Sequence, residues 1–146
     1  MTQLSTFHVG KYLFGVDVAL VQEIVRMQPI TPVPLSASEI AGLINLRGEV
    51  LTAVDLRSRL GLPPPPPEAR PQVNVVVRVD DEPVSLLVDA IDSVIEVSKL
   101  PFESTPSTVD ERTRQLITGA YTLPERLLLA LDARRVLSDL ESLAAA

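Results

Sequence analysis

A short apolar segment bracketed by two glycines constrains the fold of this chain more than any other feature. Gly42 precedes residues 43–46, and Gly48 follows Arg47 and precedes a second apolar run at residues 49–54. Gly48 supplies the backbone freedom that a tight turn needs, so the two runs predict a β hairpin. Arg47 then lies at the hairpin tip, where its guanidinium group is free to contact a partner.

Further apolar runs separated by turn residues predict that strands dominate the rest of the chain. The other expected strands cover residues 7–9, 12–16, 73–79, 84–88, 116–121 and 127–131. Gly10 and Lys11 read as a two-residue hairpin turn. The acidic residues 80–82 are more typical of a solvated hairpin tip than of a calcium site, because no further ligand spacing accompanies them.

Aspartates follow four of the apolar runs, and each precedes a segment with apolar residues at helical spacing. They are Asp17, Asp55, Asp89 and Asp132. Aspartate is a favoured helix N-cap, so a short helix is expected after each one. The last of these helices is expected to carry Val136, Leu137, Leu140 and Leu143 on one face. The recurrence indicates two related β units, each too small to close a core easily by itself.

Two segments are expected to be loops. Residues 63–71 begin with five consecutive prolines, which favour extended polyproline II and cannot join a sheet ladder. We interpret this segment as a stiff connection between two halves, with a ligand for an SH3-type domain as the alternative. Residues 101–115 are rich in Ser, Thr and Pro and are expected to form a polar loop.

Composition excludes several classes of function. The net charge of −6 argues against a nucleic-acid backbone as partner, and 3% aromatic residues leave few stacking platforms for single strands. The chain has no cysteine, so disulfides and thiolate metal sites are excluded. No apolar window is long enough to span a membrane, and the N-terminus does not resemble a signal peptide. These features predict a soluble cytoplasmic protein with no direct membrane insertion.

The sequence offers little that suggests catalysis or a cofactor. His8 is the single histidine and lies in an expected strand, where a structural role is more common than general-base chemistry. A zinc site would therefore need carboxylates almost alone, which is uncommon. No nucleophile elbow, P-loop or dinucleotide-binding fingerprint is present. We expect a protein that is not an enzyme and that has no cofactor or metal.

Several motifs, taken in order, resemble the CheW family of chemotaxis coupling proteins. They are residues 21–24 (VQEI), the proline-containing segment 30–34, residues 42–48 (GLINLRG), 53–57 (AVDLR), 88–89 (VD), 117–119 (ITG) and 130–132 (ALD). No single motif is specific, but their order and spacing are. The resemblance runs from about Phe7 to Leu140.

The resemblance implies a fold and a function. The implied fold is mainly β, with two intertwined five-stranded SH3-like β-barrels around a shared core, short helices and a C-terminal helix, in one CheW-like domain over residues 1–146. The implied function is a non-catalytic scaffold. It joins the cytoplasmic tips of methyl-accepting chemoreceptors to the regulatory domain of a CheA-type histidine kinase.

The resemblance also implies which residues meet the receptor. Glu23 and Arg47 match the family's acidic and basic positions near the receptor groove, with Val21 as an apolar neighbour. An ion pair between them would hold the hairpin tip in place, although a surface ion pair with no partner role is the alternative. Asn45 and Gly48 are better explained by turn geometry than by contacts.

The kinase-facing residues implied by the resemblance are less specific, and Val84, Leu86 and Val88 are the candidates. The chain also departs from the family pattern at residues 51–53 (LTA), where many members have a proline. This departure would weaken kinase pairing if the segment contributes to a barrel end. Two alternatives therefore stay open: an adaptor that binds receptors or regulators without the kinase, and a small β-barrel enzyme or ligand-binding domain.

Overall fold

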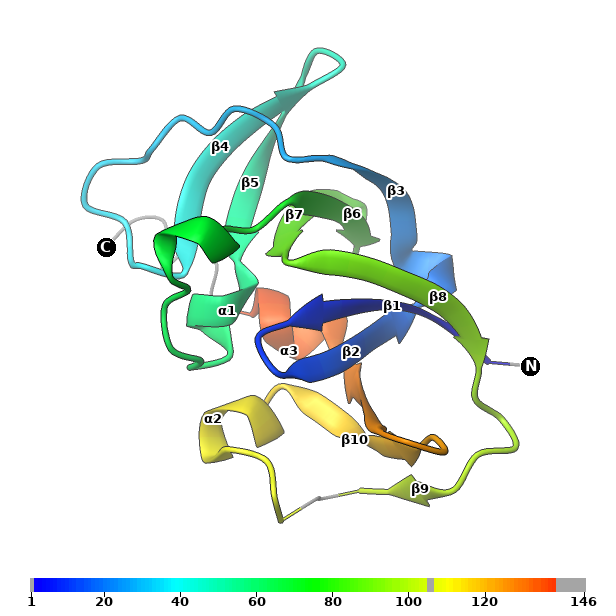
Figure 1. Ribbon diagram of the computed structural model, residues 1–146. Coiled ribbons are helices and arrows are strands. Elements are labelled where there is room, and N and C mark those ends of the chain that lie inside the picture. Colours follow the sequence, from blue (N-terminus) through cyan, green and yellow to red (C-terminus); the bar gives the residue numbers. More distant parts are fainter. Residues whose placement is uncertain (1, 105–106, 139–146) are drawn as a thin grey trace.

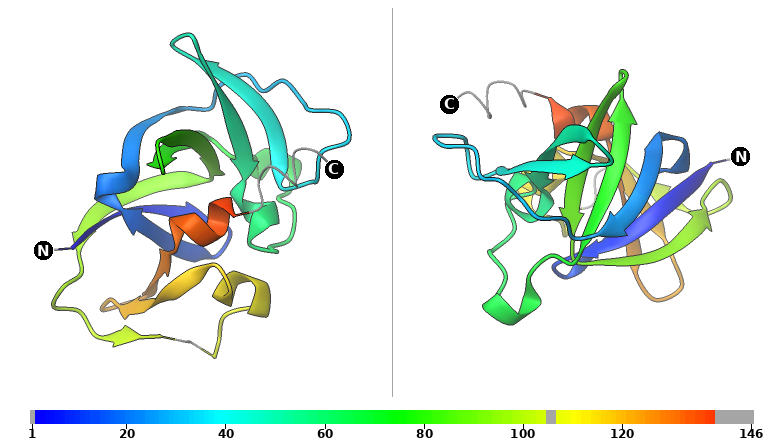
Figure 2. Two further views of the ribbon diagram at one scale, coloured as in Figure 1. Left: turned by 180° about the vertical axis from the view of Figure 1, so that it is seen from behind. Right: turned by 90° about the horizontal axis from the view of Figure 1, so that it is seen from above.

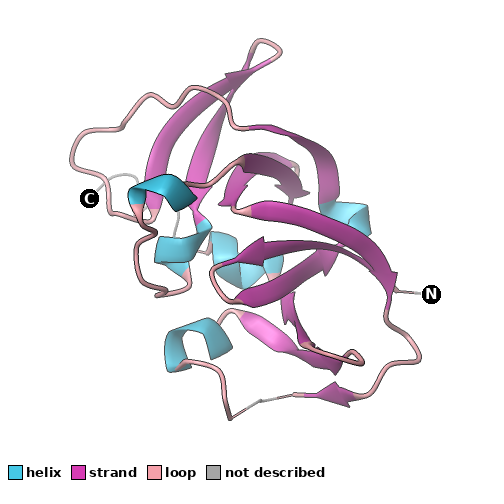
Figure 3. Cartoon of the chain, viewed as in Figure 1, coloured by secondary structure: helices cyan, strands magenta, loops and turns pink. Residues whose placement is uncertain are grey.

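Two β-sheets with short helices at their ends make up the computed structural model, which describes residues 2–104 and 107–138 (Figures 1 and 3). The first sheet has the strand order β8-β1-β2-β11-β10-β9. Its strands are β1 (Gln3–Val9), β2 (Tyr12–Asp17), β8 (Ala90–Glu96), β9 (Phe102–Glu103), β10 (Ile117–Thr122) and β11 (Leu127–Leu131). The expected mainly-β fold with two β units and short helices is confirmed, and β9 adds a two-residue sixth strand to the first sheet.

The second sheet has the order β3-β6-β7-β5-β4. Its strands are β3 (Val21–Arg26), β4 (Ile40–Leu46), β5 (Glu49–Asp55), β6 (Val73–Val79) and β7 (Glu82–Val88). The short helices are η1 (Val18–Leu20), α1 (Leu56–Arg59), η2 (Pro67–Ala69), α2 (Glu111–Arg114) and α3 (Ala133–Leu137). No helix among the described residues is long and apolar enough to cross a membrane.

The two halves of the chain repeat one topology and exchange strands. Matching the strand orders pairs β8 with β3, β1 with β6, β2 with β7, β11 with β5 and β10 with β4. The hairpin β1–β2 lies in the first sheet, but the strands that follow it, β3 to β5, lie in the second. The hairpin β6–β7 lies in the second sheet, but β8, β10 and β11 return to the first (Figure 1). Each sheet therefore needs residues from both halves, which agrees with the intertwined arrangement that the family resemblance implied.

Among the residues that the structure describes, alternating side chains form three apolar cores. Phe7 and Val9 of β1, with Val75 and Val77 of β6, are buried in a core that both sheets share. Residues on the opposite faces fill two smaller interiors, one for each sheet. The first interior contains Leu4, Leu13, Val97, Leu128 and Ala130; the second contains Ile44, Leu51, Ala53, Val76 and Leu87. Period-two alternation along one strand thus serves two cores at once.

The expected helix caps are present after two of the four aspartates. The Asp55 side chain accepts a hydrogen bond from Ser58 N at the start of α1, and that of Asp132 accepts one from Arg135 N at the start of α3. Asp17 caps only the 3₁₀ turn η1. Of the last helix, Val136 is buried and Leu137 packs against the shared core, whereas Leu140 and Leu143 lie outside the described residues.

Two expected helices are strands instead. The segment after η1 forms β3, in which half-buried and exposed residues alternate. The segment after Asp89 forms β8, and Asp89 caps no helix. Val and Ile recur in these segments at spacings of three and four, which suggested helix, but branched side chains favour strands when the backbone finds a pairing partner. That partner is β6 for β3 and β1 for β8.

The expected loops hold short elements. Pro66 has the extended backbone expected of the proline run (φ −63°, ψ 157°), and η2 begins at Pro67, the last proline of the run. Residues 101–115 contain β9, which pairs with β10, and α2, which precedes β10. This segment therefore holds regular structure and is not only a polar loop. In the left view of Figure 2, β9 and α2 lie at the lower edge of the molecule, near β10.

Candidate partner-binding site

Glu23 and Arg47 form an ion pair that joins the two edges of the second sheet. Glu23 lies on β3 and Arg47 in the turn between β4 and β5, and β3 and β4 are the outermost strands of that sheet. Arg47 Nη2 lies 3.0 Å from Glu23 Oε2. The glutamate side chain is only 18% exposed, whereas the arginine side chain is 77% exposed. The arginine therefore presents most of its surface to solvent while its charge is held by a largely covered carboxylate.

The turn that carries Arg47 has the geometry of a two-residue hairpin. Arg47 and Gly48 both have positive φ, 55° and 85°, which is typical of a type I′ turn. The Asn45 side chain accepts a hydrogen bond from Gly48 N at 3.1 Å. Asn45 and Gly48 thus build the turn, and the tip projects from the sheet at the top of Figure 1.

A bulge in β3 separates the charged side chain from its apolar neighbours. Val21 pairs with Val77, but after the bulge Glu23 pairs with Val76 and Ile24 with Val75. Because Val77 and Val75 belong to the shared core, Val21 and Ile24 lie on the face of the sheet that looks toward that core. Val21 is half-buried there, and Ile24 is 40% exposed at the sheet edge.

Edge strand β8 of the first sheet has the same arrangement. Ile91 pairs with Phe7 and Val94 with Ser5, so both lie on the face that carries Phe7 into the shared core. Both are exposed, Ile91 by 38% and Val94 by 54%. The shared core therefore ends at two exposed apolar margins, with Ile24 on β3 and with Ile91 and Val94 on β8. Apolar surface left open at two sheet edges is suited to contact with an amphipathic partner.

The candidate kinase residues Val84, Leu86 and Val88 lie inside the molecule and not on its surface. All three are buried in the shared core, and β7 is hydrogen-bonded to β6 on one side and to β5 on the other. Their side chains are not accessible to a partner in this structure. The alternation that makes β7 apolar reflects its central position in the sheet.

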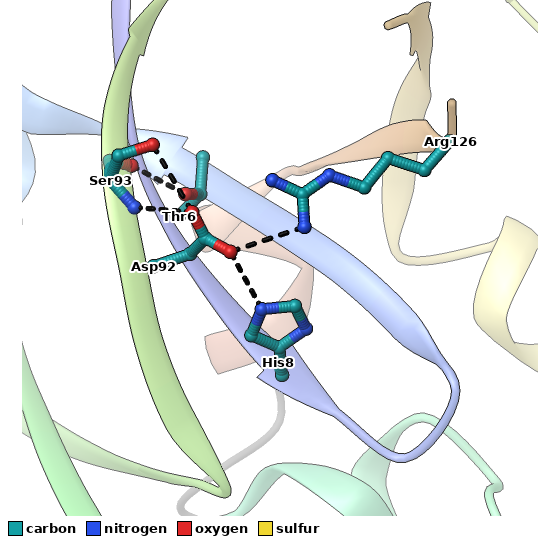
Figure 4. Close-up of polar contacts among 5 residues, drawn as sticks. All are labelled: Thr6, His8, Asp92, Ser93 and Arg126. Atoms are coloured by element: carbon teal, nitrogen blue, oxygen red, sulfur yellow. Dashed lines mark hydrogen bonds and ion pairs between the residues drawn. The ribbon is translucent and has the colours of Figure 1, made fainter. Parts of the chain in front are cut away.

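Sequence reasoning missed a polar cluster on the first sheet, made by His8, Asp92 and Arg126 (Figure 4). His8 Nε2 lies 2.7 Å and Arg126 Nη1 3.1 Å from Asp92 Oδ2. Because an ionised carboxylate only accepts hydrogen bonds, Nε2 of His8 carries a proton and donates. The hydrogen bond from His8, with those from Arg126 and Ser93 N, holds the pKa of the Asp92 carboxyl well below its usual range.

No local signal identifies this cluster, because its members come from β1, β8 and the β10–β11 turn. His8 and Asp92 are 84 residues apart, and Asp92 and Arg126 are 34 apart. Within residues 2–104 and 107–138, neither this cluster nor any other brings together three His, Cys, Asp or Glu residues that could hold a metal ion.

The family follows from comparison with known proteins. The sequence model of the CheW-like domain matches residues 3–141. This chain belongs to the CheW-like family. It is 35% identical over 143 residues to a probable chemotaxis protein CheW of Rhizobium etli, an alignment that covers 98% of this chain and 92% of the relative. It is 34% identical over 140 residues to the chemotaxis protein CheW of Bacillus subtilis, covering 96% and 88%.

A solved structure shares the fold. The crystal structure of the scaffolding protein TtCheW from Thermoanaerobacter tengcongensis superimposes with a TM-score of 0.80 at 24% identity, covering 94% of this chain and 92% of that one. The family and the fold that the sequence motifs predicted are therefore confirmed for this CheW-like chain. In this frame the Glu23–Arg47 pair lies within the family motifs, whereas the His8–Asp92–Arg126 cluster lies outside them.

Proposed function

We propose that this CheW-like protein is a non-catalytic cytoplasmic scaffold that couples chemoreceptor tips to a CheA-type histidine kinase in chemosensory signalling. The observation that carries the proposal is the Glu23–Arg47 ion pair beside the apolar edge of the second sheet. The proposal is also supported by the relatives that share about a third of its residues over most of their length, since these are chemotaxis proteins.

The receptor contact follows from the chemistry of the margin. The tip of a chemoreceptor is a helical hairpin, and such a partner presents apolar side chains at helical spacing flanked by charges. Val21 and Ile24 would receive the apolar residues, together with Ile91 and Val94 across the shared core. Arg47 would meet a carboxylate of the receptor, while Glu23 keeps the guanidinium oriented and lowers the entropy lost on binding.

The kinase contact belongs to another part of the surface. The departure from the family pattern at residues 51–53 does not bear on it directly, because Leu51 and Ala53 are buried in the second interior. β5 is also hydrogen-bonded on both sides, by β4 and β7. Retained kinase binding is therefore part of the proposal, with a surface that does not include the side chains of Val84, Leu86 and Val88.

The decisive test measures binding of the full chain to a receptor tip and to a kinase regulatory domain, each alone and both together. Arg47→Glu is expected to abolish receptor binding, because the new carboxylate would face the carboxylate of the receptor. Kinase binding should stay intact. Arg134→Glu is the matched control: Arg134 is also exposed and paired, with Asp80, but it lies on α3 and belongs to neither margin.

Each outcome has one meaning. Binding of both partners, with only the receptor arm lost in Arg47→Glu, is the result expected of a coupling scaffold. Receptor binding without kinase binding would favour an adaptor that recruits receptors or regulators alone. Failure to bind either partner would overturn the proposal and leave the fold without a chemosensory role.

A further inference from the structure

The Asp92 cluster (His8, Asp92 and Arg126) occupies the position in the first sheet that Glu23 and Arg47 occupy in the second. β8 and β3 are equivalent edge strands, and the hairpins β10–β11 and β4–β5 are equivalent in the two strand orders. In each half, a carboxylate on the edge strand pairs with an arginine from the turn of the distant hairpin. The repeated topology thus carries a repeated ionic contact.

The cluster is built around an irregular point of β8. The register between β1 and β8 shifts between Ser5 and Phe7, so that Asp92 and Ser93 together face the single residue Thr6. The Thr6 hydroxyl donates to the carbonyl of Ser93. Asp92 Oδ1 accepts hydrogen bonds from Ser93 N at 2.8 Å and from its hydroxyl at 3.1 Å. The second oxygen accepts from His8 and Arg126, so both carboxylate oxygens have partners.

This arrangement fixes which face of β8 carries its apolar residues. β8 ends the first sheet, and β1 is its strand partner in the described part of the chain. A slip of one residue in such an edge strand turns every side chain to the opposite face. With the bulge held at Asp92 and Ser93, Ile91 and Val94 both face the shared core and both stay exposed at its margin.

We propose that His8, Asp92 and Arg126 are positioning residues that hold the bulge and register of β8, so that Ile91 and Val94 are presented to the receptor. The proposal rests on the proposed function for its partner. None of the three residues needs to touch that partner. His8 and Arg126 act through their contacts with Asp92, so their role depends on the geometry of these contacts and not on exposure to the partner.

Amide hydrogen exchange of the free full-length protein tests the positioning role without any partner. Asp92→Asn keeps the shape of the side chain but removes the charge that both His8 and Arg126 contact. Amides of residues 93–96 are expected to exchange about tenfold faster in this variant, with β3 unchanged. His8→Gln keeps an N–H donor and should restore most of the protection that His8→Val loses.

Affinity for the receptor tip gives the second readout. Asp92→Asn and Arg126→Met are expected to weaken receptor binding about three- to tenfold, with kinase binding unchanged. A loss of overall stability would weaken binding to both partners. A loss of receptor binding alone therefore indicates positioning and not simple destabilisation. Arg134→Met removes a more exposed ion pair, on α3, and should change binding to neither partner.

The outcomes separate the two proposals. Unchanged exchange in β8 and unchanged receptor affinity in Asp92→Asn would overturn the positioning role while the coupling function stands. Faster exchange in β8 with unaltered receptor affinity would also overturn it, because β8 would then be held for stability alone. If the wild-type chain binds no receptor tip, the coupling function fails. The receptor-directed role of the cluster then fails with it, although exchange still reports whether the cluster holds β8.

Discussion

Gly42 and Gly119 occupy equivalent places in the two halves, and at each one the backbone of a flanking segment lies where a side chain would be. A Cβ on Gly42 would lie 2.3 Å from the carbonyl oxygen of Thr31, and one on Gly119 would lie 2.5 Å from that of Glu103. Both glycines have positive φ, 149° and 159°, and both follow a register shift in their strand. The close approach lets Thr31 bridge to β4 and β9 pair with β10.

The first prediction concerns these glycines. Gly42→Ala and Gly119→Ala are each expected to lower the free energy of unfolding by about 2–4 kcal/mol, because the clash is with backbone that cannot move aside alone. Gly48→Ala is the comparison. Its φ is also positive, but a Cβ there meets no atom within 4 Å, so only the backbone penalty of about 1–2 kcal/mol applies. Urea unfolding of the three variants measures the difference, and equal losses would contradict the role of the close approach.

The second prediction concerns the ion pair between Arg57 and Asp89. Arg57 Nη2 lies 2.7 Å from Asp89 Oδ2, the same oxygen accepts a hydrogen bond from Gly10 N, and the arginine side chain is only 12% exposed. Asp89→Asn is expected to destabilise the protein by about 2–4 kcal/mol, because it leaves a largely buried guanidinium without its counter-charge. Chemical denaturation measures the loss.

The pair between Arg134 and Asp80 provides the control for Asp89→Asn. Its atoms lie 2.5 Å apart, but its side chains are 71% and 67% exposed. Solvent screens such a pair, so Asp80→Asn should cost less than about 1 kcal/mol. A comparable loss in the two variants would show that burial does not govern the strength of these contacts.

The sequence predicted the features that depend on neighbouring residues. Asp55 and Asp132 cap their helices within three residues, and the hairpin at Arg47 and Gly48 follows from local turn chemistry. The same reasoning failed for β3 and β8, because the pairing of each strand contains a bulge that puts apolar residues three apart on the same face. Apolar residues then recur at three and four, which imitates a helix.

Long-range contacts had no signal of their own in the sequence. The acidic and basic positions at Glu23 and Arg47 were identified through the family resemblance, not through spacing. Asp92 and Arg126 lie outside the family motifs, and their pairing depends on the return of β8 to the first sheet. The burial of β7 was missed for a related reason: an apolar strand next to a turn does not reveal whether it is central or at an edge.

The third prediction concerns the proline run. Pro64 and Pro66 are exposed, and the run is attached at its start by Arg57 Nη1, which donates to Pro63 O at 3.2 Å. Replacing both with serine is expected to lower stability by about 1–2 kcal/mol, because each proline restricts the unfolded chain. Receptor and kinase binding should not change. If thermal unfolding is unaltered while a partner is lost, the run is a ligand for that partner and not a stiff connection.

The fourth prediction follows from the lowered pKa of Asp92. The folded protein keeps this carboxylate ionised at pH values where an unfolded chain protonates its aspartates, around 3.9. Above about pH 5 both states are ionised, and wild type should exceed Asp92→Asn in unfolding free energy by about 1–2 kcal/mol. As the pH falls from 5 to 3, the unfolded chain binds a proton that the folded one does not, so this advantage should shrink.

A second variant, His8→Val, removes the main cause of the lowered pKa of Asp92. At neutral pH its unfolding free energy should exceed that of Asp92→Asn by less than the wild-type value does. This smaller advantage should also decline less as the pH falls. Urea unfolding at intervals between pH 3 and pH 7 measures the three curves, and an advantage that stays constant down to pH 3 would contradict the assignment of an ionised, hydrogen-bonded Asp92.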